Sequence, residues 1–249
     1  MSTTILVLMG VCGSGKTTIG LLLSQKVGWP LEDADDYHLE GNKLKMASGI
    51  PLTDEDRLPW LLCLKNIIKK WQVAGKSGIL TCSALRKSYR DILCDRSTIH
   101  FTYSDSSAPM DNSLIIATET LSGNDKQIKT LPAQERHHIN HVISETTILG
   151  AQCHQAAQKF GQLSVTLKTD KQNLLPEDVP PSVLFVYLKG SKQILEERLN
   201  KRKGHFMSPS LLSSQLQYLE EPTSEENHIV IDVDQPPNAI VKLIIEAIT

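Results

Sequence analysis

The strongest constraint on the fold is a glycine-rich segment near the start of the chain, Gly10-Val-Cys-Gly-Ser-Gly-Lys-Thr17. It matches the phosphate-loop pattern G-x-x-x-x-G-K-S/T. The apolar run at 5–9 predicts a buried strand before the loop, and apolar residues at helical spacing from Ile19 to Val27 predict a helix that ends at Gly28. The sequence therefore predicts a strand, a loop and a helix in succession, which is the structural context that the pattern requires.

Each part of this loop suits a phosphate group. Glycines let successive backbone N–H groups curl around phosphate oxygens at the positive end of a helix. The Lys16 ammonium is placed to reach the β- and γ-phosphates, and the Thr17 hydroxyl is available to Mg²⁺. We therefore expect the chain to bind ATP or GTP, with Lys16 also acting in catalysis. The expected nucleotide-binding residues of the loop are Gly10, Val11, Cys12, Gly13, Ser14, Gly15, Lys16, Thr17 and Thr18.

Composition narrows the class of protein. The chain has 249 residues, of which 40% are hydrophobic and 22% charged, enough for one substantial core or one core with an insertion. Its formal net charge of −2 gives no basic field that would recruit nucleic acid or an anionic membrane. Five cysteines without a C-x-x-C pair favour reduced thiols. With a strand starting so close to Met1 and no apolar run of membrane-spanning length, we expect a cytoplasmic protein.

Strands and helices alternate along most of the chain. Beyond the first strand, buried strands are predicted at 29–31, 79–82, 183–188 and 229–232. Helices are predicted at 60–68, 85–93, 194–201, 211–219 and 239–248, the first of them with Asp54, Glu55 and Asp56 in its capping region. This alternation predicts an α/β fold with a parallel sheet, helices on both faces and a site at the carboxyl ends of the strands.

The alternation fails between about residues 98 and 181. This stretch is polar, has few aromatic residues and shows only weak periodicity around 148–160 and 163–167, and it is far longer than an ordinary loop. We interpret it as a mostly disordered or loosely helical insertion in a single domain spanning 1–249. It contains His137, His138 and His141, which we interpret as a solvated cluster because no Asp or Glu completes a recognised set of metal ligands.

Two common nucleotide-binding classes fit the sequence poorly. A regulatory GTPase needs an N-K-x-D guanine-binding motif, and the segment from Asn42 to Lys45 lacks the Asp. A motor or AAA-type ATPase needs an acidic residue at the end of its third strand, where this chain has Thr81-Cys82-Ser83. The chain is therefore expected to take its acidic groups from another segment.

That segment is Asp33-Ala34-Asp35, directly after the second predicted strand. If the chain is still extended there, both carboxylates point toward one ligand. One would then orient Mg²⁺ through water, and the other would accept a proton from the attacking hydroxyl. We assign Asp33 to the metal and Asp35 to the proton, although the residues alone equally allow a solvated acidic turn or exchanged roles.

Six ordered segments of the chain resemble the gluconokinase family. They are residues 33–38, 42–60, 82–91, 198–207, 214–222 and 232–236, so that the resemblance covers 1 to about 97 and 181–249. It implies a fold similar to shikimate and nucleoside-monophosphate kinases and a transfer of the ATP γ-phosphoryl group to the 6-hydroxyl of D-gluconate, giving 6-phospho-D-gluconate. It also implies a homodimer. The compact family members lack the central insertion, which removes no family motif.

Several residues of these segments are candidates for the lid and the nucleotide site. Arg198 and Arg202 lie four residues apart on one predicted helix face beside Gly204, which suits a lid that closes late over the transferred phosphoryl group. We expect Arg198 to contact the nucleotide and Arg202 to act in catalysis, with a solvated basic face as the alternative. Related kinases wrap adenine with backbone groups after the last strand, which here is Asp234-Gln235-Pro236.

The acceptor site is expected to hold a carboxylate. Arg57 presents a planar fork that matches a carboxylate, which gluconate has and neutral sugars lack. The alternative is that Arg57 only pairs with the acidic residues that cap its helix. Further candidates for the acceptor are Asp35, His38, Lys45, Arg86 and His205. Two other functions remain open: a kinase for another carboxylated polyol such as shikimate, and a nucleotide-binding protein whose insertion has inactivated its lid.

Overall fold

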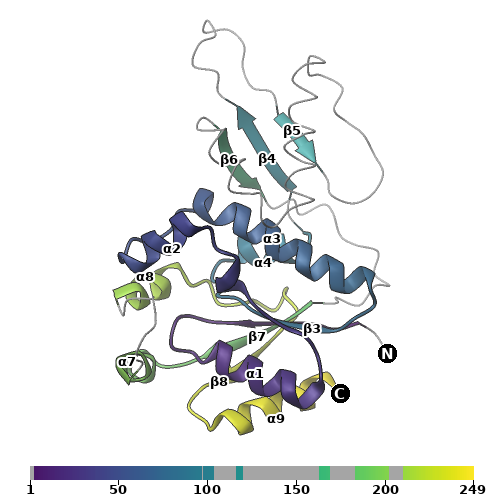
Figure 1. The fold of residues 1–249 in the computed structure, drawn as a ribbon, viewed down its shortest axis with the longest axis vertical. Coiled ribbons are helices and arrows are strands. Elements are labelled where there is room, and N and C mark those ends of the chain that lie inside the picture. The colour runs from purple at the N-terminus through teal and green to yellow at the C-terminus, as the bar shows by residue number, and fades with distance from the viewer. Residues whose placement is uncertain (1–2, 97, 104–115, 120–162, 169–182, 202–209) are drawn as a thin grey trace, which may run out of the picture.

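A five-stranded parallel sheet forms the centre of the molecule (Figure 1). The structure is a computed structural model that describes residues 3–96, 98–103, 116–119, 163–168, 183–201 and 210–249. The strands lie in the order β2-β3-β1-β7-β8, with every neighbouring pair parallel. Their bounds are β1 Ile5–Met9, β2 Leu31–Asp33, β3 Gly78–Thr81, β7 Val183–Lys189 and β8 His228–Asp232. The predicted α/β fold is confirmed.

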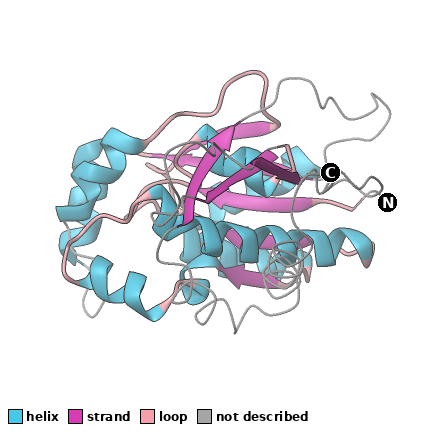
Figure 2. Ribbon diagram, turned by 90° about the horizontal axis from the view of Figure 1, so that it is seen from above, coloured by secondary structure: helices cyan, strands magenta, loops and turns pink. Residues whose placement is uncertain are grey.

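Helices cover both faces of this sheet (Figures 1 and 2). Successive side chains of a strand point to opposite faces, and all five of β1 are fully buried. Ile5, Val7 and Met9 join the core under α3 and α4, whereas Leu6 and Leu8 join the core under α1 and α9. The helices are α1 Lys16–Val27, α2 Glu40–Ala47, α3 Asp54–Val73, α4 Lys87–Leu93, α7 Lys192–Lys201, α8 Ser210–Tyr218 and α9 Pro237–Ile248.

Most elements fall where the sequence predicts them, with three differences. The second strand starts at Leu31 rather than Trp29, because Pro30 has no N–H to donate to a ladder. Helix α2 was not expected, since only Asn42 and Met46 of its polar sequence are buried. Helix α3 begins at Asp54, inside the predicted capping region, extends beyond the predicted 60–68 to Val73, and has the preceding Thr53 as its N-cap. None of the helices in the described ranges combines the length and apolar character of a membrane-spanning segment.

The described parts of the central insertion are strands. They are β4 Thr98–Tyr103, β5 Ile116–Glu119 and β6 Leu163–Lys168, which pair antiparallel in the order β5-β4-β6. The expectation of disorder or loose helix is therefore wrong for these three segments, which pair across tens of residues of sequence. The predicted histidine cluster of His137, His138 and His141 lies outside the described residues.

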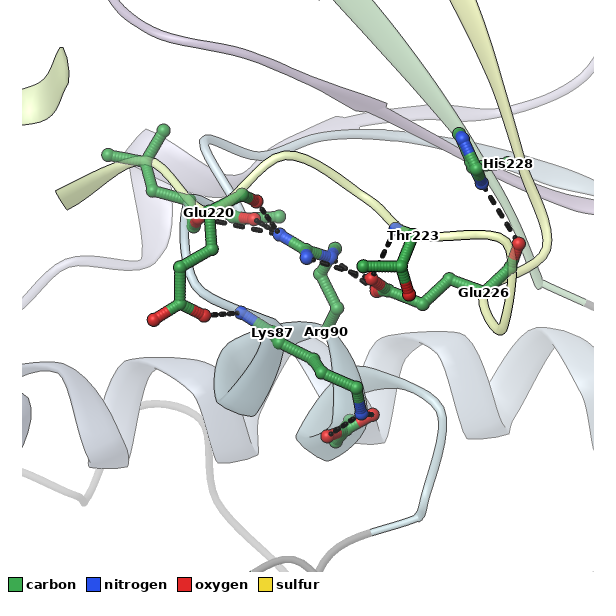
Figure 3. A network of polar contacts seen from close by, with 9 residues as sticks. Lys87, Arg90, Glu220, Thr223, Glu226 and His228 are labelled. Atoms are coloured by element: carbon green, nitrogen blue, oxygen red, sulfur yellow. Dashed lines mark hydrogen bonds and ion pairs between the residues drawn. The ribbon is translucent and has the colours of Figure 1, made fainter.

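A buried ion pair connects the helix before the insertion to the loop that leads into β8 (Figure 3). Arg90 of α4 is 1% exposed and donates from Nε and Nη2 to the Glu226 carboxylate, at 2.5 and 3.0 Å. Burial acts to raise the pKa of Glu226, but its contacts with Arg90 and with the Thr223 amide outweigh burial and lower the pKa. The next residue, Asn227, donates to the carbonyl oxygen of Val183 at the start of β7. One loop thus holds both chain segments that flank the insertion.

We expect Glu226→Gln to destabilise the protein by about 3–5 kcal/mol, because it leaves the buried Arg90 guanidinium without its counter-charge. The free energy of unfolding in urea measures the loss. Glu225→Gln is a matched control, since the neighbouring Glu225 is exposed and its loss should cost less than about 0.5 kcal/mol. Equal unfolding midpoints for the two variants would contradict the importance of the pair.

We propose that residues 1–249 form one domain in which 98–181 is a dispensable insertion. A deletion that joins Arg96 to Ser182 through a short Gly/Ser linker should still unfold cooperatively and bind nucleotide. The loop ends are already held by the core, and each doubling of loop length changes the closure free energy by only ~0.6 kcal/mol. Thermal unfolding and nucleotide titration measure both properties. A deletion protein that fails to fold would show that the insertion is part of the core.

Candidate active site

A cavity of about 200 Å³ lies at the carboxyl ends of β1, β2 and β3. This is the edge of the sheet where the alternation of strands and helices predicts a site. The lining residues come from the segments after these three strands, together with α2, α3, α7 and α8. They are Cys12, Gly13, Gly15, Lys16, Thr17, Asp33, Asp35, His38, Met46, Leu52, Arg57, Trp60, Ser83, Leu85, Tyr89, Leu199 and Gln215.

The phosphate loop links β1 to the N-terminus of α1. Gly10 has a φ of +144°, and a Cβ there would lie 2.8 Å from the carbonyl oxygen of Leu188. Only glycine therefore fits where the loop leaves the sheet. Val11 and Ser14 are buried in the loop, whereas Thr17 and Thr18 are exposed at the start of the helix. The loop has the predicted context, and the binding roles of its residues remain predictions.

Lys16 curls back over the loop that precedes it. Its Nζ donates to the carbonyl oxygens of Gly10 at 2.9 Å and Val11 at 3.1 Å. Burial lowers the pKa of Lys16, while the nearby carboxylates of Asp35 and Asp33 act in the opposite direction. The ammonium thus lies in the cavity wall beside two acidic groups.

Asp33 and Thr17 form a pair of oxygen ligands beside the loop. Thr17 Oγ1 donates to Asp33 Oδ2 at 2.9 Å, and Asp33 Oδ1 accepts from the backbone N–H of Asp35 at 3.1 Å. The chain is not extended here, which was the condition for both carboxylates to point toward one ligand: Ala34–Tyr37 forms a 3₁₀-helix that Asp33 caps. Both aspartates nevertheless line the cavity. A hydroxyl and a carboxylate suit Mg²⁺, which usually takes few protein ligands and completes its shell with water and phosphate oxygens.

His38 stacks on Trp60 in the cavity wall. The ring centroids lie 4.3 Å apart with the planes inclined by 13°, and the indole N–H donates to the carbonyl oxygen of Ala34. His38 Nδ1 is buried and has no hydrogen-bonding partner among the described residues. Burial, with smaller contributions from Arg57 and Lys43, lowers the pKa of His38 to about 4. The ring is therefore neutral at physiological pH.

Arg57 reaches the cavity from the first turn of α3. Its Nη1 donates to the carbonyl oxygens of Leu52 and Thr53, and lies 3.4 Å from the Tyr89 hydroxyl. No hydrogen bond within the described part of the chain uses its Nη2 or Nε. Asp54 lies 4.0 Å from Nη1, a loose ion pair. Within the described ranges, one edge of the guanidinium thus has no hydrogen-bonding partner, and the residue lines the cavity.

Asp54 connects Arg86 to Tyr89 instead of capping its helix. Its Oδ2 accepts from Arg86 Nη1 at 2.7 Å, and its Oδ1 accepts from the Tyr89 hydroxyl. The Arg86 guanidinium also lies over the ring of Tyr218, 4.7 Å from its centroid. Arg86 itself is outside the cavity lining, but Asp54 connects it to Tyr89, which lines the cavity.

Of the other predicted residues, Lys45 lies outside the cavity lining and donates to both carboxylate oxygens of Asp56, at 2.7 and 2.9 Å. Arg198 lies beside the phosphate loop, since a Cβ on Gly15 would be 4.0 Å from its Nη1. Its Nη2 donates to the carbonyl oxygen of Val233 at 2.6 Å. Arg198 thus connects the loop to the turn that contains Asp234, Gln235 and Pro236. Arg202 and His205 lie outside the described residues.

Eight residues of the cavity wall were not predicted to take part: the aliphatic side chains and thioether of Met46, Leu52, Leu85 and Leu199, and the polar or aromatic side chains of Trp60, Ser83, Tyr89 and Gln215. Trp60 and Tyr89 lie in segments that carry the family resemblance, but each also sits on an apolar helix face that indicates core. Ser83 follows β3, and its carbonyl oxygen accepts from the Gly10 N–H at 3.3 Å. Gln215 accepts from the backbone N–H of Cys12 across 203 residues of sequence. No local pattern signals such contacts.

A parallel sheet with a phosphate loop at the end of its central strand, and an acidic cavity wall beside that loop, defines the class of P-loop kinases. No family model matches the chain. A mouse protein named "Probable gluconokinase" is 37% identical to it, over 98% of this chain and 97% of the mouse chain. The crystal structure of a sugar kinase from Janibacter sp. matches with a TM-score of 0.61 and 30% identity, covering 98% of this chain and 93% of the other.

A gluconokinase from Sinorhizobium meliloti gives a TM-score of 0.55 and 28% identity, over 97% of this chain and 88% of its own. The identity to the mouse protein extends over nearly the full length of both chains, and the fold agrees. The chain belongs to the gluconokinase family.

The neutral state of His38 makes stability depend on pH. Its pKa is about 4 when folded and 6.5 in the unfolded chain, so between these values only the unfolded state binds the proton. The free energy of unfolding should therefore be unaffected above pH 6.5 and fall as the pH falls toward 4, by on the order of 3 kcal/mol from this residue.

His38→Phe keeps the stack on Trp60 and cannot titrate. The loss of unfolding free energy between pH 7 and pH 4.5 should be on the order of 2–3 kcal/mol larger in the wild type than in this variant. Chemical denaturation at the two pH values measures it. The carboxylates contribute equally to both proteins, so identical pH dependence would show that His38 is not buried in its neutral form.

Proposed function

We propose that the protein transfers the γ-phosphoryl group of ATP to the 6-hydroxyl of D-gluconate, giving 6-phospho-D-gluconate. Membership of the gluconokinase family supports this reaction. The observation that carries it is that one cavity is lined by the phosphate loop and Asp35 and also by Arg57, whose guanidinium has one edge without a hydrogen-bonding partner among the described residues. A ligand with a hydroxyl at one end and a carboxylate at the other suits these two sets of groups.

The nucleotide is assigned to the loop and to Arg198. Backbone N–H groups at the start of α1 and the Lys16 ammonium would hold the phosphates, and the Asp234–Pro236 turn would contact adenine through its backbone. Thr17 and Asp33 would hold Mg²⁺, which neutralises charge on the β- and γ-phosphates when bound. Lys16 would exchange its present contacts with the loop carbonyls for phosphate oxygens.

The acceptor is assigned to the opposite part of the cavity. Asp35 would accept the proton of the 6-hydroxyl as the oxygen attacks phosphorus, and Arg57 would bind the carboxylate with its free edge. Neutral His38 offers a polar ring to a sugar hydroxyl without attracting an anion. Arg86 is placed to support this wall through Asp54, and Lys45 through Asp56. From the resemblance alone, Arg202 and His205 would complete the site from the lid.

We also propose that the enzyme acts in the cytoplasm as a homodimer, without a nucleic-acid or membrane partner. The reduced-thiol pattern, the net charge and the family resemblance support this proposal. Gel filtration with light scattering tests the dimer.

The reaction is tested by ADP release with gluconate, shikimate, AMP, glucose or no acceptor. Gluconate should be used at least 10³-fold more efficiently than glucose, because an acceptor without the acid leaves one edge of the half-buried Arg57 guanidinium without a partner. Preferred use of shikimate would identify a different carboxylated polyol as the substrate. Nucleotide binding without ADP release for any acceptor would identify a non-catalytic protein.

Arg57→Lys keeps the positive charge and loses the fork. We expect it to raise the KM for gluconate about 10- to 100-fold, since a charge-assisted bidentate contact is worth about 1.5–3 kcal/mol, and to leave the KM for ATP nearly unchanged. Steady-state kinetics with the two substrates varied separately measure both constants. Arg96→Lys, outside the cavity lining, is the matched control. A raised KM for ATP with an unaltered KM for gluconate would assign Arg57 to the nucleotide.

A further inference from the structure

Helix α8 places the polar residue Gln215 on the face that packs against the phosphate loop. Leu212 of this helix is buried, and Leu216 packs with it against Val11 and Cys12 of the loop, Leu85 after β3, and Leu195 and Leu199 of α7. Gln215 shares this face, because residues three or four apart lie on the same side of a helix. A polar amide that is packed among leucines destabilises the fold unless it forms hydrogen bonds.

The amide of Gln215 has a defined orientation. The backbone N–H of Cys12 donates to its Oε1 at 2.6 Å. Since an N–H group can be satisfied only by an acceptor, the oxygen of the amide must face the loop and the NH₂ group must face elsewhere. No hydrogen bond within the described residues uses this NH₂ group, and Gln215 lines the cavity. Two oriented donors are therefore available beside the loop.

The two donors of the Gln215 NH₂ group lie on the phosphate side of the cavity, which indicates the ligand group that they would contact. The cavity wall next to Cys12 also contains Gly13 and Lys16, which belong to the loop that holds phosphates, whereas Arg57 belongs to the acceptor side. Phosphoryl transfer needs donors fixed in advance around the oxygens of the moving group. A neutral amide can supply them without competing for the Asp35 carboxylate.

We propose that Gln215 contacts the transferred phosphoryl group: the Cys12 N–H fixes its carbonyl oxygen, and its NH₂ group donates to a γ-phosphate oxygen during transfer. The proposal rests on the proposed kinase reaction, but it does not depend on which acceptor is used. It assigns to α8 a part in catalysis in addition to its packing against the loop.

Gln215→Glu distinguishes the role of the amide oxygen from the role of the NH₂ group. The carboxylate has the same size and still accepts from the Cys12 N–H, but it removes both donors and places a negative charge toward the phosphate. We expect kcat to fall by about 10²–10³. The Kd for a non-hydrolysable ATP analogue should rise at least tenfold while the Kd for ADP changes less than threefold, because only the analogue carries a γ-phosphate.

Two further variants complete the test. Gln217→Glu adds the same charge to an exposed position of the same helix and should behave as the wild type. Gln215→Met loses both the tether and the donors without adding charge, and should also lower kcat and weaken the analogue relative to ADP. Thermal unfolding of each variant establishes whether it is folded. If the glutamate variant is unfolded, the kcat and the two dissociation constants of the methionine variant decide the test.

A glutamate variant with wild-type kcat and a wild-type ratio of the two dissociation constants would overturn the proposal and leave Gln215 a tether for the loop. The nucleotide titrations need no acceptor. A wild type that binds both nucleotides but releases no ADP with gluconate would therefore refute the proposed function separately, while the ratio of the constants still tests Gln215.

Discussion

The buried pair of Arg90 and Glu226 is the interaction on which the active site depends most. A guanidinium without exposure to water must have a counter-charge and fill its remaining donors, and Arg90 donates also to the carbonyl oxygens of Ala84 and Glu220, at 3.0 and 2.9 Å. Ala84 has a φ of +44°, which is strained for a residue with a side chain. Arg90 thus holds in place the turn after β3, and the Ser83 carbonyl of that turn accepts from the first glycine of the phosphate loop.

The phosphate-loop side and the acceptor side of the cavity carry groups of different charge. Lys16, Asp33 and Asp35 are charged groups placed beside one another at the phosphate loop, and their charges compensate in part before any ligand binds. On the acceptor side, burial keeps His38 neutral, and Asp54 uses its carboxylate on Arg86 and Tyr89. Arg57 therefore keeps an edge without a partner among the described residues. The phosphate-loop side can bind the reacting hydroxyl of an acceptor and the Arg57 side its carboxylate. This difference orients an acceptor that carries a hydroxyl at one end and a carboxylate at the other.

Local patterns predicted the features that depend on neighbouring residues. The phosphate loop, the alternation of strands and helices and the capped start of α3 are each encoded within a few turns of chain. The strands β4–β6 and the contact of Gln215 with Cys12 were missed, because both depend on segments that meet only after folding. The pair of Asp33 and Asp35 is an intermediate case: its place at the cavity was predicted, but the 3₁₀-helix that carries Asp35 was not.

The loop that contacts both α4 and the start of β7 has a consequence for how this chain can vary. Because β7 pairs with β1 through Val183–Tyr187 and with β8 through Phe185–Lys189, and Asn227 contacts its first residue, the sheet order is complete without any help from the intervening residues. The junction between α4 and β7 is thus a point where evolution can add or remove sequence without altering the strand neighbours. Among relatives, differences in length should concentrate at this junction, and an insert there can acquire a function of its own while the catalytic sheet stays unchanged.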